Sequence, residues 1–173
     1  MKIKEIDFNN IFFKKRFVDF CISSLPIEEV EYGSLESKTI QAKSYLAELH
    51  SSDIAIFSIN DRNKPVIYCF FDKKEQSKTI DLSFVFPAQA FSSVKKLKEL
   101  RWGFYICCLK AMELSGYDKI NAKVRRRHKK ASMIKFIKRW CKAFEIKKIK
   151  KGYSEKLIIK KKHLEYEIKK LQL

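Results

Sequence analysis

Hydrophobic and polar residues alternate from Thr79 to Phe86, and Pro87 ends the alternation. A period of two places the apolar members of this run on one face, which predicts a half-buried strand. After the break, apolar residues recur every three or four positions from Val94 to Leu114, and Gly116 follows. That spacing predicts a long helix with an apolar stripe against a core. The chain is organised around this unit of strand, break and buried helix.

The remaining pattern predicts elements on both sides of this unit. Apolar or alternating runs predict strands at residues 2–6, 54–59, 66–71, 119–124, 145–149 and 155–159. Spacing of three and four predicts helices at residues 11–23, 37–50, 131–144 and 163–173. Short polar turns predict antiparallel hairpins among the three strands before the long helix. The long helix predicts a parallel pair between 79–86 and 119–124, joined by a right-handed crossover.

Composition and charge narrow the class of protein. A chain of 173 residues, 46% of them hydrophobic, is long enough to bury a core, which excludes a disordered chain. We expect one domain over residues 1–162 and a C-terminal amphipathic helix or tail at 163–173. The net charge is +18, and residues 95–173 hold 26 basic and only 7 acidic residues. This half is expected to attract polyanions such as nucleic acid or acidic protein, although lysine-rich composition also serves solubility.

The basic side chains predict one polyanion-binding surface. They begin in the densest charge run of the chain and continue on the outward face of the helix expected at 131–144: Arg125, Arg126, Arg127, Lys129, Lys130, Lys135, Lys138, Arg139 and Lys142. Such a surface contacts phosphates without reading base sequence, and its affinity falls steeply with salt.

The five cysteines lie inside apolar patterns, and no two of them have metal-ligand or redox spacing. We therefore expect reduced core thiols, a cytoplasmic protein and no metal site. The first residues are polar and charged, so no signal peptide is expected. No apolar run approaches the roughly 18 residues that span a bilayer, and no membrane association is expected.

The order of the predicted elements resembles that of the GCN5-related N-acetyltransferase (GNAT) family over most of residues 1–160. The local features that carry the resemblance are Val85-Phe86-Pro87 at the end of a strand and Ile120–Val124 leading into a helix. Ala143-Phe144 stands where the family has a Gly-Phe pair. The resemblance implies an α/β acyl-CoA N-acyltransferase-like fold, with a mixed, mainly antiparallel sheet flanked by helices.

The resemblance also implies acetyl-CoA, inserted where strands 79–86 and 119–124 diverge, with its pyrophosphate at the start of the long helix. Exposed N–H groups and the helix dipole favour a phosphate there. In the family's phosphate turn this sequence keeps Gln89, but Ser92 and Val94 replace two small residues. The implied cofactor residues are Val85 and Phe86 for the pantetheine arm, and Gln89, Ser92, Ser93 and Val94 for the pyrophosphate.

Catalysis in the family requires a base that takes a proton from the amine and an acid that protonates the departing thiolate. Asp81 is the one carboxylate within the strand 79–86, so the resemblance makes it the base, although its alternation phase also fits a solvent-facing residue. Tyr153, the first tyrosine after the helix at 131–144, is the implied acid. Trp140 stands in the region where many members carry a tyrosine.

Two functions follow from these observations. The first is a divergent N-acetyltransferase that acts on an amine of a small molecule or protein, with an acceptor that is polyanion-associated. The alternative is a catalytically inactive GNAT-like scaffold that binds nucleic acid or another polyanion through its basic half. The enzyme hypothesis requires residues 79–86 and 119–124 to diverge after Pro87, and it requires Val94 to leave that gap open.

Overall fold

The computed structural model describes residues 1–7, 10–24, 34–87, 92–125, 144–148 and 154–172. Its strands are β1 Lys2–Glu5, β2 Ile54–Ile59, β3 Pro65–Lys74, β4 Thr79–Val85, β5 Lys119–Arg125, β6 Phe144–Lys148 and β7 Ser154–Lys160. The helices are α1 Ile11–Ser24, α2 Leu35–Ser51, α3 Val94–Ser115 and α5 Lys161–Gln172, with a short 3-10 helix, η2, at Glu75–Ser77. Among the described helices, none is both long and apolar enough to cross a membrane.

The seven strands form one sheet in the order β1-β2-β3-β4-β5-β7-β6. Every neighbouring pair is antiparallel except β4 and β5, which are parallel. Successive strands joined by short turns pair antiparallel, whereas the parallel pair is separated by the whole of α3, as crossover connections require. The mixed, mainly antiparallel sheet predicted from the sequence is therefore confirmed.

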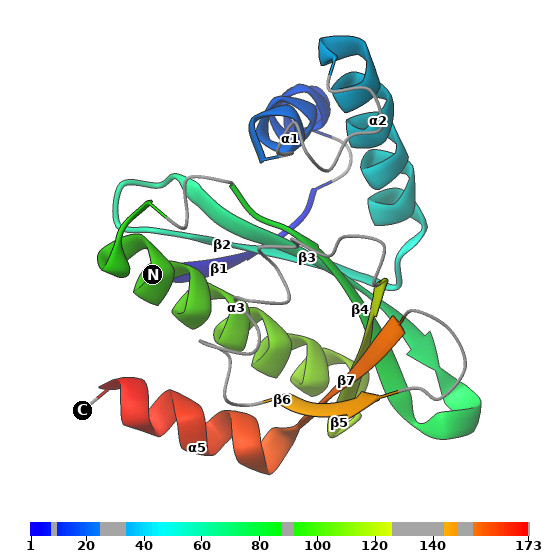
Figure 1. Cartoon of the computed structure of the whole chain (residues 1–173), viewed down its shortest axis with the longest axis vertical. Helices are drawn as coiled ribbons and strands as arrows, with labels where there is room; N and C mark the ends of the chain where they lie inside the picture. The colour runs from blue at the N-terminus through cyan, green and yellow to red at the C-terminus, as the bar shows by residue number, and fades with distance from the viewer. Residues whose placement is uncertain (8–9, 25–33, 88–91, 126–143, 149–153, 173) are drawn as a thin grey trace.

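Helices cover both faces of the sheet, giving three layers (Figure 1). Phe104 and Tyr105 of α3 are fully buried against one face, where Leu164 and Ile168 of α5 join the same apolar cluster. Phe17 of α1 and Leu49 of α2 belong to a second cluster on the opposite face. Because side chains alternate along a strand, β3 and β4 contribute to both clusters.

Helix ends lie where local capping chemistry places them. The Ser93 hydroxyl accepts a hydrogen bond from the Lys96 N–H at 3.3 Å, which satisfies one donor of the first turn of α3. Gly116 ends the same helix with φ 74°, and its N–H donates to the Met112 carbonyl. A positive φ costs glycine little, so the long helix ends where the sequence predicts.

One element boundary differs from the sequence prediction. Phe144 was expected to end a helix, but it is the first residue of β6, with its backbone opposite Ile159 of β7. An aromatic residue at that position extends the ladder by one residue, in keeping with the preference of aromatics for strands. The rest of the predicted helix at 131–144 lies outside the described residues.

Gly103 lies where α3 approaches the sheet most closely. A Cβ at this position would overlap the Ser58 Oγ and stand 3.1 Å from the Met1 Sδ. We therefore expect Gly103→Ala to lower the free energy of unfolding by about 1–3 kcal/mol, even though alanine favours helices by about 1 kcal/mol. Urea unfolding measures the change.

Ser58→Ala in the same chain provides the control for this substitution. The Ser58 hydroxyl is buried with no hydrogen-bond partner among the described residues, so its removal costs little and makes room for the new methyl group. The double variant is expected to recover most of the lost stability. A single Gly103→Ala variant as stable as the parent would contradict the close approach.

Candidate functional site

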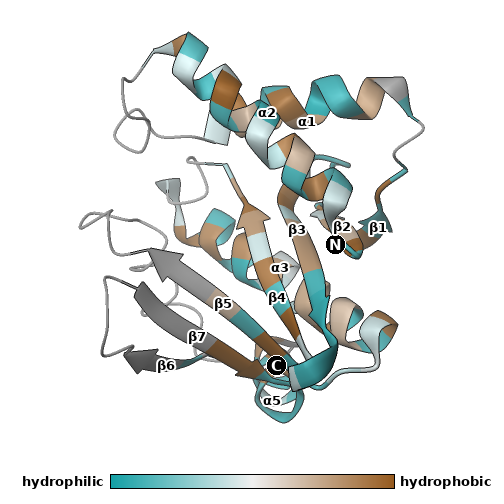
Figure 2. Cartoon of the chain, turned by 90° about the vertical axis from the view of Figure 1, so that its right-hand side faces the viewer, coloured by the Kyte–Doolittle hydropathy of each residue, from teal (hydrophilic) through white to brown (hydrophobic). Residues whose placement is uncertain are grey.

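The parallel strands β4 and β5 separate soon after they meet. Their backbones pair only at Ile80 with Ile120 and at Asp81 with Asn121, although each strand continues for several more residues. Figure 2 shows the two strands together at one end and apart at the other. The two strands therefore diverge, as the enzyme hypothesis requires, but they part after Asp81 and not after Pro87. We call the position of these two pairs the fork.

The first turn of α3 follows the open end of β4. Amide groups in the first turn of a helix have no acceptor within the helix, and the helix dipole adds positive potential there. Ser93 caps this turn, and the Ser92 hydroxyl accepts a hydrogen bond from the Lys96 ammonium at 3.1 Å. The Val94 side chain is 60% exposed, so it is directed to solvent and is not buried in the gap between β4 and β5.

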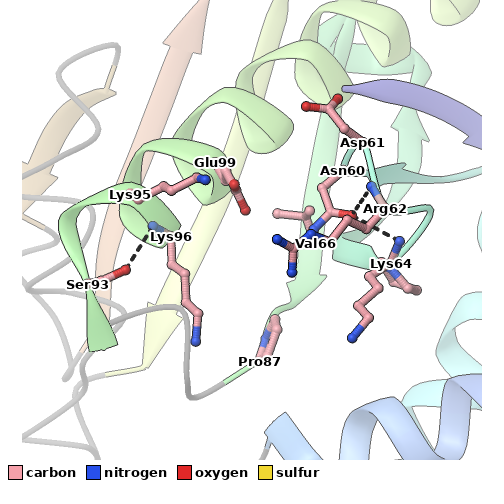
Figure 3. Close-up of a pocket in the computed structure, with 11 residues that line it drawn as sticks. Asn60, Asp61, Arg62, Lys64, Val66, Pro87, Ser93, Lys95, Lys96 and Glu99 are labelled. Carbon is pink, nitrogen blue, oxygen red and sulfur yellow. Dashed lines mark hydrogen bonds between the residues drawn. The ribbon is translucent and has the colours of Figure 1, made fainter.

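A hollow of about 580 Å³ adjoins this turn, between α3 and the loop that joins β2 to β3 (Figure 3). Four of its side chains are basic and two are acidic, and the full lining is Asn60, Asp61, Arg62, Lys64, Pro65, Val66, Pro87, Ser93, Lys95, Lys96 and Glu99. Asn60 orders the loop, because its side-chain oxygen accepts from the backbone N–H groups of Arg62 and Lys64 at 3.0 and 3.1 Å. The hollow therefore combines a helix N-terminus with excess positive charge, which suits a phosphate.

The predicted pantetheine residues lie at the end of β4. The Val85 side chain is buried in the cluster under α1 and α2, and the Phe86 ring packs half-buried on the opposite cluster, 5.9 Å from the Phe84 ring. Their side chains are thus engaged in packing, and a ligand in the gap would meet backbone. Gln89 lies outside the described residues.

Asp81, the predicted base, lies at the fork. It is half-buried on the face of β4 that is opposite to Ile80 and Leu82, both of which pack under α3. This face is the one covered by α2, so Asp81 is not a fully solvated residue. Asp72 of β3 is its register partner, which places two carboxylates on adjacent strands.

Two further carboxylates reach the same face, one from α2 and one from the connection between α2 and β2. The Ser83 hydroxyl donates to the Glu48 carboxylate at 2.6 Å, which ties α2 to β4. The Lys73 N–H donates to the Asp53 carboxylate at 2.6 Å, which places Asp53 beside Asp72. We call Glu48, Asp53, Asp72 and Asp81 the acidic row.

Partial burial raises the pKa of the Asp72 carboxyl and is the largest cause of the shift. The carboxylates of Asp53, Glu48 and Asp81 add to it, whereas Lys74 on the same strand acts in the opposite direction. A raised pKa means that the folded protein favours the protonated form. Asp72 therefore adds stability in acid, below its unfolded pKa near about 3.9, and that stability is lost as the pH rises through the folded pKa.

Asp72→Asn should consequently increase the free energy of unfolding at pH 7, because the amide removes a carboxylate that the fold disfavours. The gain should shrink as the pH falls toward about 3, where Asp72 of the parent protein is itself protonated. Urea unfolding at several pH values measures the difference. Asp19→Asn, which changes an exposed carboxylate of α1, is the control. A difference independent of pH would contradict the assignment.

Asn121 lies across the fork from Asp81 and is only 7% exposed. Its Nδ2 donates to the Thr79 Oγ1 at 3.0 Å, and Thr79 is bonded in turn to the Ser77 hydroxyl at 2.7 Å. The Asn121 Oδ1 is buried with no hydrogen-bond partner among the described residues. A buried acceptor of this kind lacks the N–H or O–H donor that would compensate its desolvation.

Sequence patterns identified only part of this site. Asp81 was identified as the one carboxylate within the predicted strand 79–86, but Glu48, Asp53, Asp72 and Asn121 were missed. Asp72 follows directly on a predicted strand, which is the one local signal available. These residues come together because of the registers of β4 with β3 and β5, and because α2 packs over this face of the sheet.

Other predicted residues lie outside the described part of the chain. These are Tyr153, the proposed acid, and most of the polyanion surface: Arg126, Arg127, Lys129, Lys130, Lys135, Lys138, Arg139 and Lys142. For Arg125 the structure gives only the backbone, which pairs with Ser154. Within the described ranges, no group of three or more His, Cys, Asp or Glu side chains is placed to hold a metal ion.

Solved structures of N-acetyltransferases are similar to this chain over nearly its whole length. An aminoglycoside 6'-acetyltransferase type Ii matches with a TM-score of 0.61 and 15% identity, over 92% of this chain and 97% of that chain. An aminoglycoside 6'-N-acetyltransferase complexed with coenzyme A matches with a TM-score of 0.55 and 13% identity, over 92% and 95%.

A mutant of the spermidine N-acetyltransferase SpeG from Vibrio cholerae matches with a TM-score of 0.56 and 9% identity, over 95% of this chain and 97% of that chain. No protein-family model and no curated protein matches the sequence. Identities of this size show that the fold is shared.

Proposed function

We propose that the chain is an N-acetyltransferase that uses acetyl-CoA and an amine acceptor. The premise is the GNAT acyltransferase fold that the sequence predicts. The observation that carries the proposal is the fork: β4 and β5 pair at two positions only, and a capped helix N-terminus follows the open end. Similar structures named for aminoglycoside and spermidine acetylation support an amine as the acceptor.

The residues present fit acetyl-CoA. Ser92, Ser93 and the first-turn amides of α3 would hold the pyrophosphate, and Lys95 and Lys96 would add positive charge beside it. The backbone of Val85 and Phe86, exposed by the divergence of β5, would pair with the pantetheine arm. From the fork to Val85, β4 extends over roughly 13 Å. This length would separate the pyrophosphate of acetyl-CoA from its reacting acetyl group.

Acetyl-CoA supplies the acetyl group: a C–N bond to the amine forms, the C–S bond breaks, and the two protons lost from the ammonium go to the base and to the thiolate. Asp81 at the fork is the proposed base, because it is half-buried on the face opposite α3 and lies at the closed end of the gap. Tyr153 remains the proposed acid from the sequence.

Calorimetric titration with acetyl-CoA tests the proposal. We expect saturable binding, thermal stabilisation of the protein, and release of free coenzyme A thiol when a suitable amine is added. No heat and no stabilisation at millimolar acetyl-CoA would overturn the proposal and leave a GNAT-fold binding scaffold.

Charge reversal at the mouth of α3 is a second test. Lys95→Glu together with Lys96→Glu should weaken acetyl-CoA binding by about tenfold or more, because two cations beside the phosphates become anions. The control is Lys14→Glu with Lys15→Glu, which makes the same charge change on the exposed face of α1. Equal affinities of the two double variants would place the phosphates elsewhere.

A further inference from the structure

The hollow beside the first turn of α3 has a second wall that the proposed pyrophosphate site leaves unused. That wall is the loop that joins β2 to β3. Figure 3 shows Arg62 and Lys64 of this loop on one side of the hollow and the α3 lysines on the other, with Pro87 between them. The loop therefore brings two cations to the site from an element that the resemblance to the acyltransferase family did not implicate.

Hydrogen bonds order this loop. The Asn60 side-chain oxygen accepts from the backbone N–H groups of Arg62 and Lys64, at 3.0 and 3.1 Å. The Asn60 N–H donates to the Lys64 carbonyl, and the Asn63 N–H donates to the Asn60 carbonyl, both at 3.0 Å. A loop that is ordered before binding loses less conformational freedom when a ligand binds. Arg62 and Lys64 are therefore carried on a preorganised backbone.

The charges of the hollow favour an anion on the loop side. Its acidic side chains are Asp61 and Glu99, and the Asp61 carboxylate already accepts a hydrogen bond from the Met1 ammonium at 3.1 Å. Arg62 and Lys64 are both exposed to solvent. A guanidinium offers two parallel donors that match phosphate oxygens, and an ammonium adds a point charge. A phosphate monoester, with a charge of roughly −1.5 to −2 at neutral pH, suits this pair.

The hollow and the gap between β4 and β5 lie on different sides of the end of β4. Val66 of β3 and Pro87 bound the hollow, and β3 and β5 flank β4 on opposite sides in the sheet. The hollow begins at Ser93, beside the proposed pyrophosphate site. Its volume of about 580 Å³ lies within the roughly 300–1,000 Å³ typical of small-molecule sites. A nucleotide whose pyrophosphate lies at this turn would therefore have room on the loop side.

We propose that Arg62 and Lys64 bind the 3′-phosphate of acetyl-CoA, with its adenosine in the hollow, and that the protein thereby selects the 3′-phosphorylated donor over the dephosphorylated one. This inference rests on the proposed acetyl transfer. The 3′-phosphate is remote from the thioester, so the two side chains stabilise the bound donor and the transition state equally. They therefore lower the KM for acetyl-CoA and leave kcat unchanged.

Acetyl-CoA and acetyl-dephospho-CoA, which differ only in the 3′-phosphate, test the proposal. Calorimetry should show that the dephosphorylated donor binds at least about tenfold more weakly, because it lacks the charge-assisted hydrogen bonds to the loop. With a saturating amine, thiol release should show a KM raised by a similar factor and an equal kcat. Equal affinities for the two donors would overturn the inference while leaving acetyl transfer intact.

Variants assign the preference to the loop. Arg62→Gln with Lys64→Gln should reduce the ratio of the two donor affinities to near one, because both loop cations are removed. The control is Lys15→Gln with Arg16→Gln, which removes the same two residue types from exposed positions of α1 and should leave the ratio unchanged. A ratio that falls equally in both double variants would assign the preference to overall charge and overturn the inference.

Adenosine 3′,5′-bisphosphate provides a readout separate from activity, because it contains the nucleotide end of acetyl-CoA and no thioester. Calorimetry should show that it binds about tenfold more tightly than adenosine 5′-phosphate, and that the loop double variant removes this difference. Such binding in a protein that does not bind acetyl-CoA would refute the acetyltransferase and retain the phosphate site. Unchanged affinity of the loop double variant for acetyl-CoA would refute the phosphate site alone.

Discussion

Asp81→Asn is expected to lower kcat/KM for acetyl transfer by about 10²–10⁴-fold, because the amide cannot take the proton that the amine must lose. The substitution is nearly isosteric, and it removes one carboxylate from the acidic row that contributes to the raised pKa of Asp72. The variant should therefore fold as stably as the parent and bind acetyl-CoA with unchanged affinity. Thiol release with a diamine acceptor, together with calorimetry, measures both properties.

Glu113→Gln is the matched control, since Glu113 is an exposed carboxylate on α3, the helix behind the opposite face of the sheet. It should retain parental activity. A variant with parental kcat/KM would assign the base to another group or to water.

Phe104→Ala is expected to lower the free energy of unfolding by about 3–5 kcal/mol, because it leaves a large cavity in the core. Phe104 is fully buried, and its ring centroid lies 5.1 Å from that of Phe84 on β4. For a domain of this size the melting temperature should fall by roughly 6–20 °C. Phe104 also holds β4 against α3, so weaker acetyl-CoA binding should accompany the loss of stability.

Phe12→Ala is the control for this loss, because the Phe12 side chain is 73% exposed on α1. Its effect should remain within about 0.5 kcal/mol. Chemical denaturation of both variants under the same conditions makes the comparison direct. A loss below 1 kcal/mol for Phe104→Ala would indicate that the core relaxes to fill the space or that α3 packs differently.

Charge is distributed unequally over the two ends of the candidate site. The hollow at the mouth of α3 carries Arg62, Lys64, Lys95 and Lys96, whereas the face under α2 carries the acidic row. Positive potential at one end of the site suits an anionic donor, and negative potential at the other suits a cationic acceptor. The anionic partner predicted from overall charge is not supported by the similar structures, which are named for aminoglycoside and spermidine acetylation.

The sequence by itself determined the elements and the fold. Alternation within 79–86 and helical spacing from Val94 to Leu114 are local patterns, and each follows from the geometry of one element. The chain-order argument for a parallel pair between 79–86 and 119–124 also needed no coordinates, because a long intervening helix permits few other connections. Asp81 was identified in the same region as the one carboxylate of the predicted strand 79–86, through the resemblance to the acyltransferase family.

The tertiary structure alone decided which side chains meet. Asp72 and Asp81 lie on the two strands of one hairpin, whereas Asn121 follows after the whole of α3, and their neighbourhood depends on the registers of two strand pairs. A shift of one residue in either register would place other side chains opposite Asp81, and the alternation within one strand does not specify its partner on the next. The distance at which β4 and β5 separate is likewise a property of the whole sheet, because the layers packed on each face determine it. The fold could therefore be predicted from the sequence, whereas the acidic row and the buried Asn121 oxygen could be seen only in three dimensions.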